Sequence, residues 1–161
     1  MNAAERRVLL ERYREGYRAV EGAVAEITKD ELDAHPLEGE WSVREIVHHL
    51  ADSEMTSAVR LRRLLAEEHP TIEGYDEQEF ARRLHYERPI ESSLLVVDAV
   101  RRSTADLLRR LTEQEWSREG THSESGAYSV ETWLQIYAAH CHDHADQIRR
   151  VREATATTAA H

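Results

Sequence analysis

Cysteine, glycine and proline are scarce in this 161-residue sequence, which contains one cysteine, six glycines and three prolines. A single cysteine cannot form an intramolecular disulfide and fits a reducing compartment, so we expect a cytoplasmic protein. So few glycines and prolines leave room for long uninterrupted helices. The sequence also lacks a long apolar run, so we expect neither a membrane span nor a secretory signal.

Lysine is almost absent, because Lys29 is the only lysine among 21 basic residues. The 31 acidic residues outnumber the basic ones and leave a formal net charge of −10 with histidine counted as neutral. Non-specific binding to nucleic acid requires a net basic surface that releases counterions. We therefore expect no nucleic-acid partner, and the lack of a long apolar run argues against a membrane partner.

The spacing of the apolar residues predicts an all-α fold with long amphipathic helices. Three capping boxes, which begin at Thr28, Ser42 and Thr112, mark helix starts, and Ser129 is the expected cap of the last long helix. Four long helices are expected over residues of about 2–27, 42–67, 90–111 and 129–153.

The connections between these helices differ in length. Residues 68–89 form a long crossover with a short helix around residues 76–84, and residues 120–127 are expected to form a polar loop. The length of the chain suits one hydrophobic core. We therefore assign residues 1–153 to a single four-helix-bundle domain and residues 154–161 to a frayed C-terminal tail rich in alanine and threonine.

A weak internal repeat is visible, because each half of the sequence reads as long helix, capped turn, loop and long helix. Such a plan pairs the second and fourth long helices across a four-helix core. Capping boxes also recur by chance in helical proteins, so a chance recurrence is the alternative explanation.

Three histidines lie on the fourth long helix. His140 and His144 are four residues apart and share one face, which is the spacing of a metal-ligand pair. His142 is rotated away from the apolar stripe and is expected in water, whereas Cys141 lies on the stripe and is better explained as a small core residue than as a nucleophile. The alternative for the histidine pair is a partly buried position satisfied by a carbonyl or a carboxylate.

A third ligand is available on the second long helix. His49 stands on the edge of its apolar stripe and can face the same interior edge as His140 and His144, while His48 points roughly opposite the stripe. Three neutral imidazoles from two facing helices leave a fourth position open for water or substrate, which is the arrangement of a catalytic metal site.

Glu54 falls well inside the apolar stripe of the same helix. A carboxylate there requires a partner, so it is a fourth ligand, a general base, a residue that orients a ligand, or one half of a salt bridge to an arginine of another helix. Asp52 and Asp143 fall outside the stripes and either orient ligands or are solvated.

Three sequence blocks carry a resemblance to a known family. They are Trp41-Ser-Val-Arg-Glu-Ile-Val-His-His49-Leu-Ala-Asp-Ser53, Pro70-Thr-Ile-Glu-Gly-Tyr75-Asp-Glu77 and Tyr137-Ala-Ala-His140-x-x-x-His144-x-x-Gln-Ile148. Together, and in this order, they resemble the DinB/YfiT-like superfamily and are most similar to its YfiT/bacillithiol-transferase branch. The resemblance spans residues 36–150.

The resemblance implies a four-helix bundle with a long crossover, a homodimer, and one divalent metal ion, commonly nickel or zinc. Carried over residue by residue, the metal ligands are His49, His140 and His144. The sequence departs from the YfiT branch at Glu54, where a histidine is common, and at Asp143 and Gln147, which replace further histidines.

The resemblance to this superfamily implies a small-molecule substrate and three hypotheses for the activity. The first is a thiol S-transferase in detoxification that uses a low-molecular-weight thiol as co-substrate, with Glu54 or Tyr137 assisting proton transfer. The second is a metal-dependent hydrolase in which the same ion activates water. The third is a non-catalytic, stress-related metal- or ligand-binding protein. In the first, Arg82 or Arg83 of the crossover can hold a carboxylate of the thiol.

Overall fold

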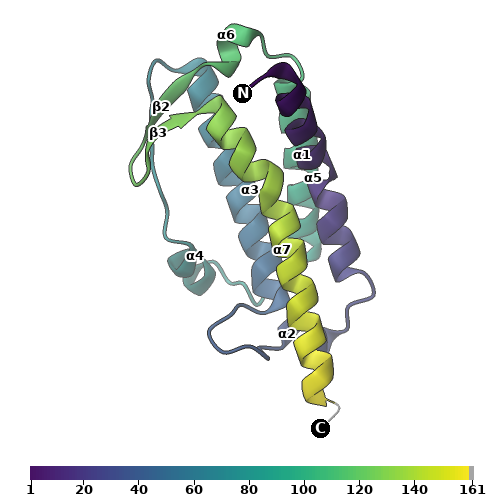
Figure 1. Ribbon diagram of the computed structural model, residues 1–161. Coiled ribbons are helices and arrows are strands. Elements are labelled where there is room, and N and C mark those ends of the chain that lie inside the picture. The colour runs from purple at the N-terminus through teal and green to yellow at the C-terminus, as the bar shows by residue number, and fades with distance from the viewer. Residues whose placement is uncertain (160–161) are drawn as a thin grey trace.

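Four long helices make up most of the chain in the computed structural model, which describes residues 1–159 (Figure 1). They are α1 (Ala3–Val24), α3 (Val43–Ala66), α5 (Glu91–Leu108) and α7 (Val130–Ala159). Helix α1 packs against α5 and α7, and α3 packs against the same two helices. The predicted four-helix bundle is therefore confirmed, and α3 and α7, which carry the three histidines, are neighbours in it.

The helix starts follow the capping signals. The side chains of Thr28, Ser42 and Thr112 each accept a hydrogen bond from the backbone at the third helical position, and a glutamate at that position returns the bond. These boxes begin α2 (Lys29–Asp33), α3 and α6 (Glu113–Trp116). Ser129 accepts a hydrogen bond of 3.0 Å from the backbone N–H of Thr132 at the start of α7.

The expectation of a polar loop at residues 120–127 was wrong. Strands β2 (Glu119–His122) and β3 (Gly126–Ser129) form an antiparallel hairpin there, and β2 also pairs in parallel with β1 (Thr71–Ile72) of the crossover. The side chains of β2 alternate between exposed and buried positions. A Cβ on Gly120 would lie 2.3 Å from the carbonyl oxygen of Pro70, so only glycine allows the two segments to come this close.

The crossover runs along the outer side of α3 (Figure 1). Its short helix α4 (Glu77–Arg83) begins after Asp76, whose carboxylate accepts a hydrogen bond from the backbone N–H of Glu79. Helix α4 packs against α3. The crossover therefore covers a face of α3 that the four-helix bundle alone would leave in water.

Helix α7 does not fray after about Glu153 but continues to Ala159. In this last segment the hydroxyl groups of Thr155, Thr157 and Thr158 each donate a hydrogen bond to the carbonyl oxygen four residues earlier. Residues 160 and 161, which belong to the expected tail, lie outside the described part. Within residues 1–159, no helix has both the length and the apolar character needed to cross a membrane.

Candidate metal centre

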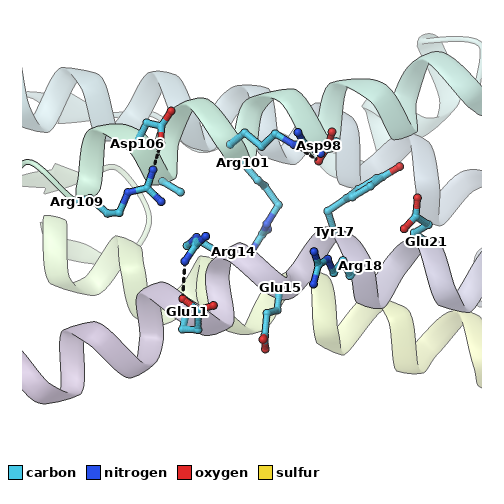
Figure 2. Close-up of a pocket in the computed structure, with 12 residues that line it drawn as sticks. Glu11, Arg14, Glu15, Tyr17, Arg18, Glu21, Asp98, Arg101, Asp106 and Arg109 are labelled. Atoms are coloured by element: carbon cyan, nitrogen blue, oxygen red, sulfur yellow. Dashed lines mark hydrogen bonds and ion pairs between the residues drawn. The ribbon is translucent and has the colours of Figure 1, made fainter.

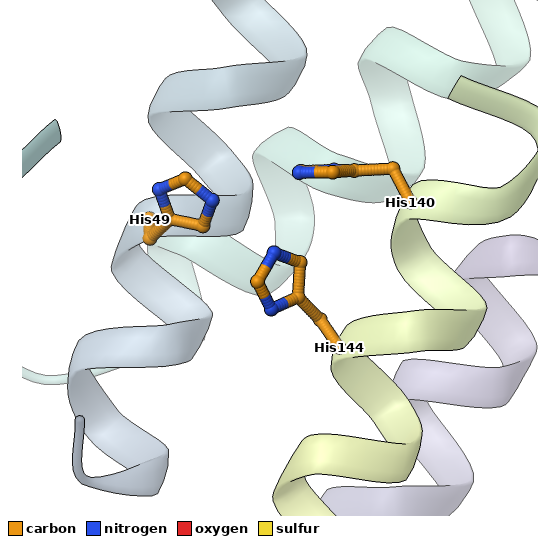
Figure 3. Close-up of side chains that lie close together, drawn as sticks. All are labelled: His49, His140 and His144. Atoms are coloured by element: carbon orange, nitrogen blue, oxygen red, sulfur yellow. The ribbon is translucent and has the colours of Figure 1, made fainter. Parts of the chain in front are cut away.

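His49, His140 and His144 meet between α3 and α7 (Figure 3). One ring nitrogen of each histidine lies within 4.8 Å of a ring nitrogen of each of the other two. The ring centroids of His140 and His144 are 4.6 Å apart, and those of His49 and His144 are 4.9 Å apart. The structure therefore brings together, from two helices, the three side chains that the sequence singled out.

All three imidazoles are held in the neutral form. Burial, with a smaller contribution from the nearby His144, lowers the pKa of His49 to about 3. Burial also lowers the pKa of His140, well below the ordinary value, and that of His144. Neutral imidazole offers the lone pair that a metal ion needs, so at neutral pH the cluster is ready to bind a cation.

The hydrogen bonds of the cluster fit a bound ion. The Nδ1 atoms of His49 and His140 are buried and have no hydrogen-bond partner within the described chain. Nδ1 of His144 lies 2.8 Å from Oε1 of Gln147, so a proton on Nδ1 leaves Nε2 free to bind a cation. Buried polar atoms without a partner are rare. Imidazole groups suit zinc and nickel, so this donor set fits a divalent ion of that kind.

Aromatic side chains enclose the cluster. The ring of Trp41 lies 4.8 Å from that of His49, and the ring of Tyr137 lies 5.7 Å from that of His140. Tyr137 is buried, and its hydroxyl accepts a hydrogen bond of 3.4 Å from Arg60. Of the two residues predicted to assist proton transfer, Tyr137 is thus the one beside the histidines.

Glu54 faces the interior of the bundle and is fully buried. Its carboxylate pairs with Arg101 of α5 and accepts hydrogen bonds from the Tyr13 hydroxyl at 3.4 Å and the Cys141 thiol at 3.6 Å. It is not part of the cluster of ligand atoms formed by the three histidines. The salt bridge to an arginine of another helix, one of the four alternatives for Glu54, is the interaction that the structure contains.

The sequence patterns did not single out Arg101, which is the neighbour of Val100 on α5. In the structure Arg101 is buried, and Val100 is half-buried. The signal that could have found it was Glu54 itself, because a buried carboxylate requires a cationic partner. The expectation for Cys141 held: it is fully buried in the core, and burial raises the pKa of its thiol.

The expectation for His48 was wrong, and the solvated alternative for Asp52 is excluded. His48, expected opposite the apolar stripe, is fully buried, with its ring nitrogens 2.8 Å from the Ser93 hydroxyl and 2.9 Å from the carbonyl oxygen of Arg88. Asp52, beside it, is also buried and accepts a hydrogen bond of 2.7 Å from Tyr86. The crossover and the start of α5 supply these partners. Contacts between segments far apart in the sequence therefore bury His48 and Asp52, which helical spacing alone does not predict.

His142 is not surrounded by water as expected. It is half-buried, and its Nε2 lies 2.9 Å from the carbonyl oxygen of Arg12 in α1. Asp143, by contrast, is exposed, so the solvated alternative describes it. Neither residue belongs to the three-histidine cluster.

A groove of about 510 Å³ lies between α1 and α5, away from the histidines (Figure 2). Charged side chains line it, and several pair with one another, among them Arg14 with Glu11 and Arg102 with Asp98. None of the three histidines lines this groove. Because its charges are largely satisfied among themselves, the histidine cluster is the stronger candidate for the functional site.

The chain is similar to known proteins over most of its length. The sequence model that describes the DinB superfamily matches residues 12–148. A protein of Oceanobacillus iheyensis named "Putative metal-dependent hydrolase" is 38% identical over 127 residues, which cover 79% of this chain and 74% of that protein. A relative of the same name from Bacillus mycoides is 30% identical over 131 residues, which cover 81% and 76% of the two chains.

A solved structure has the same fold. YfiT from Bacillus subtilis, described as "a probable metal-dependent hydrolase with an unusual four-helix bundle topology", aligns with a TM-score of 0.89 at 29% identity. The alignment covers 95% of this chain and 89% of that one.

Proposed function

The chain belongs to the DinB superfamily, and from this premise we propose that it is a divalent-metal-dependent enzyme that transfers a low-molecular-weight thiol to an electrophilic small molecule. The ligands of the proposal are His49, His140 and His144, and the ion is zinc or nickel. The observation that carries the choice of a thiol is the composition of the cluster, which holds three neutral imidazoles and no carboxylate.

The lack of a carboxylate favours a nucleophile that ionises easily. A divalent ion held by neutral ligands lowers the pKa of a bound thiol or water and so supplies a nucleophile near neutral pH. A free thiol has a pKa near 8.5, whereas water has one near 15.7, so a thiol needs less help from a general base. Glu54, the residue of α3 proposed as a general base, is already paired with Arg101.

The protein's own residues have distinct roles in this proposal. His49, His140 and His144 stay neutral and hold the ion, and Gln147 fixes the orientation of His144 through its 2.8 Å hydrogen bond. Burial raises the pKa of Tyr137, so its hydroxyl keeps its proton at neutral pH and can donate a hydrogen bond to the electrophile. The S–H proton leaves to solvent, a carbon–sulfur bond forms, and the leaving group departs with its electron pair.

A metal-dependent hydrolase is the second candidate, because the relatives from O. iheyensis and B. mycoides carry that name. In this case water takes the place of the thiol, and a base must come from the substrate, from solvent or from Glu54 after a rearrangement of its ion pair.

One experiment separates these candidates. The protein is reconstituted with zinc or nickel and supplied with a haloaromatic electrophile and a panel of low-molecular-weight thiols, with chromogenic esters and amides in a parallel series. We expect product formation that requires both the thiol and the ion and that is lost in His144→Ala. Ester or amide hydrolysis without thiol dependence would support the hydrolase. A fully metal-loaded protein that is inactive in both series would make it a binding protein.

A further inference from the structure

Arg60 lies in line with the metal centre on α3. His49, Ser53 and Arg60 follow one another at steps of four and seven residues, which places them on the same face of the helix. Arg60 is half-buried, and within residues 1–159 no carboxylate oxygen lies within 4.0 Å of its guanidinium. Its Nε atom is buried without a hydrogen-bond partner. A partly buried cation without a counter-ion is a group that attracts an anionic ligand.

Two tyrosines converge on the same place. The hydroxyl of Tyr137 accepts a hydrogen bond of 3.4 Å from Arg60. The ring of Tyr75, from the crossover, lies below the guanidinium at 5.6 Å, and its hydroxyl is buried without a hydrogen-bond partner. Ser53 is close enough to both tyrosines to affect their ionisation. The Tyr75 hydroxyl and the Nε atom of Arg60 therefore lack an acceptor within residues 1–159, whereas the other two guanidinium nitrogens of Arg60 donate to the Tyr137 hydroxyl and, at 2.7 Å, to the carbonyl oxygen of Glu73.

Tyr137 connects this group to the histidines. Its ring lies 5.7 Å from that of His140 and its hydroxyl contacts Arg60, so one side chain spans the distance between the metal centre and the guanidinium. The metal centre and Arg60 are therefore separated by a single tyrosine side chain.

We propose that Arg60, Tyr75 and Tyr137 form a subsite for a carboxylate group of the small-molecule thiol or its acceptor, next to the three-histidine centre. The inference rests on the proposed function for the identity of the reacting end of that molecule. The earlier assignment of this role to Arg82 or Arg83 is replaced, because both arginines are exposed and pair with Glu79.

The charges around Arg60 favour a carboxylate over a phosphate. The subsite has one cationic group and two neutral hydroxyls, and a carboxylate already lies near it, so a ligand group of low charge is favoured. Glu77 of α4 lies close enough to interact with Arg60 but forms no ion pair with it within 4.0 Å. A dianionic phosphate would meet this second negative charge with only one guanidinium to compensate it.

The test uses matched ligands with the zinc-loaded protein. Titration calorimetry compares 3-mercaptopropionate and 6-mercaptohexanoate with their amides, which keep the thiol and lose the charge. We expect at least one acid to bind about tenfold or more tightly than its amide, the range of a charge-assisted hydrogen bond. Arg60→Gln should remove this preference, and Tyr75→Phe should reduce it. Glu77→Gln should increase it, an opposite effect that a purely structural role of Arg60 would not produce.

The control is Arg82→Gln, an exposed crossover arginine that should leave the preference unchanged. A ratio of acid to amide affinity that is the same in the wild type and in Arg60→Gln overturns the subsite. Competition by inorganic phosphate that is stronger than competition by propionate overturns the choice of a carboxylate.

A failure of the proposed function can be distinguished from a failure of the subsite. If elemental analysis finds no bound ion, the metal centre fails, and the subsite is then tested in the metal-free protein. There, propionate should raise the melting temperature of the wild type and not that of Arg60→Gln. Equal shifts in the two proteins would overturn the subsite without reference to the metal.

Discussion

Arg101 of α5 and Glu54 of α3 form an ion pair that is closed off from water at the centre of the bundle, with 2% and 0% of the two side chains exposed. Arg101 also donates hydrogen bonds to the backbone carbonyl oxygens of Tyr13 at 2.9 Å and Tyr137 at 2.8 Å. Its guanidinium lies 4.0 Å from the centroid of the Tyr13 ring. One side chain thus joins α1, α3, α5 and α7.

Breaking this pair should destabilise the fold rather than the metal centre. Arg101→Met leaves the Glu54 carboxylate buried without a counter-charge, and we expect a loss of roughly 3–5 kcal/mol in the free energy of unfolding. The double variant Arg101→Met with Glu54→Leu should lose less than the two single variants together. Chemical denaturation measures both quantities.

Glu54→Gln is the variant that separates the roles of this residue. We expect lower stability and an unchanged one-to-one metal content by elemental analysis. A variant with normal stability and metal content, but with turnover lowered by about 10²-fold or more, would instead make Glu54 a general base. Weaker metal affinity alone would make it a ligand.

Gly16 allows α1 to approach Arg101 closely. A Cβ at this position would lie 2.7 Å from Nη2 of Arg101 and 2.9 Å from Cβ of Cys141, so Gly16→Ala should cost about 1–3 kcal/mol of stability. Gly22 of the same helix has open space around it, and Gly22→Ala should stabilise by about 0.5–1 kcal/mol. Thermal unfolding of the two variants tests both expectations. Changes in stability of the same sign and size would contradict the close approach of α1 to Arg101 at Gly16.

The metal prediction is one divalent ion per chain, held by three histidines. His49→Ala, His140→Ala and His144→Ala should each abolish stoichiometric binding, as measured by elemental analysis after dialysis. His142→Ala is the control and should retain the ion. His48→Ala should also retain it but lose stability, because His48 is buried and hydrogen-bonded. Full retention of the ion in His144→Ala would exclude this ligand set.

The stability of the metal-free protein should fall as the pH is lowered from 7 to 5. Burial lowers the pKa of His49 from 6.5 to about 3, so the unfolded chain binds a proton more tightly than the folded one. The stabilisation is therefore complete above pH 6.5 and is lost as the pH falls toward 3, by up to about 1.4 kcal/mol per pH unit for each such histidine.

His140 and His144 are shifted in the same direction, and ordinary carboxylates titrate below this window. Denaturation midpoints measured at several pH values should show a smaller slope in His49→Gln than in the wild type. A flat profile between pH 7 and 5 would show that these histidines are not held neutral by burial.

We further expect a homodimer, as the resemblance to the DinB/YfiT-like superfamily implies. Light scattering at micromolar concentration should give the mass of two chains. A monomeric mass over the same range of concentration would refute this expectation.

The helices were predictable because their signals are local. Each capping box is a contact between residues three positions apart, and the apolar stripes of α3 and α7 depend only on the helical period. The same period placed His140 and His144 on one face and brought His49 to the facing edge. Sequence alone therefore identified the three residues of the cluster.

What the sequence did not predict depends on segments far apart in the chain. The strands β2 and β3 are each four residues long and polar. The second partner of β2 is β1, which lies far from it in the sequence, in the crossover. His48 points away from the apolar stripe, and contacts with the crossover and with the start of α5 bury it. Arg60 and Tyr75 meet for the same reason, so the subsite beside the histidines could not be inferred from helical spacing.

The pairing of β1 with β2 also bears on the order in which the protein assembles. Packing of α3 on α7 is enough to collect the three histidines, whereas Tyr75 is placed by a crossover whose strand must find a partner in the hairpin before α7. Contacts between such distant segments form slowly, because the loop between them must close first. The strand pair closes the shorter loop, from Thr71 to Thr121, whereas the histidine cluster closes a longer one, from His49 to His140, so loop closure favours a chain whose crossover is in place before its histidines can hold an ion.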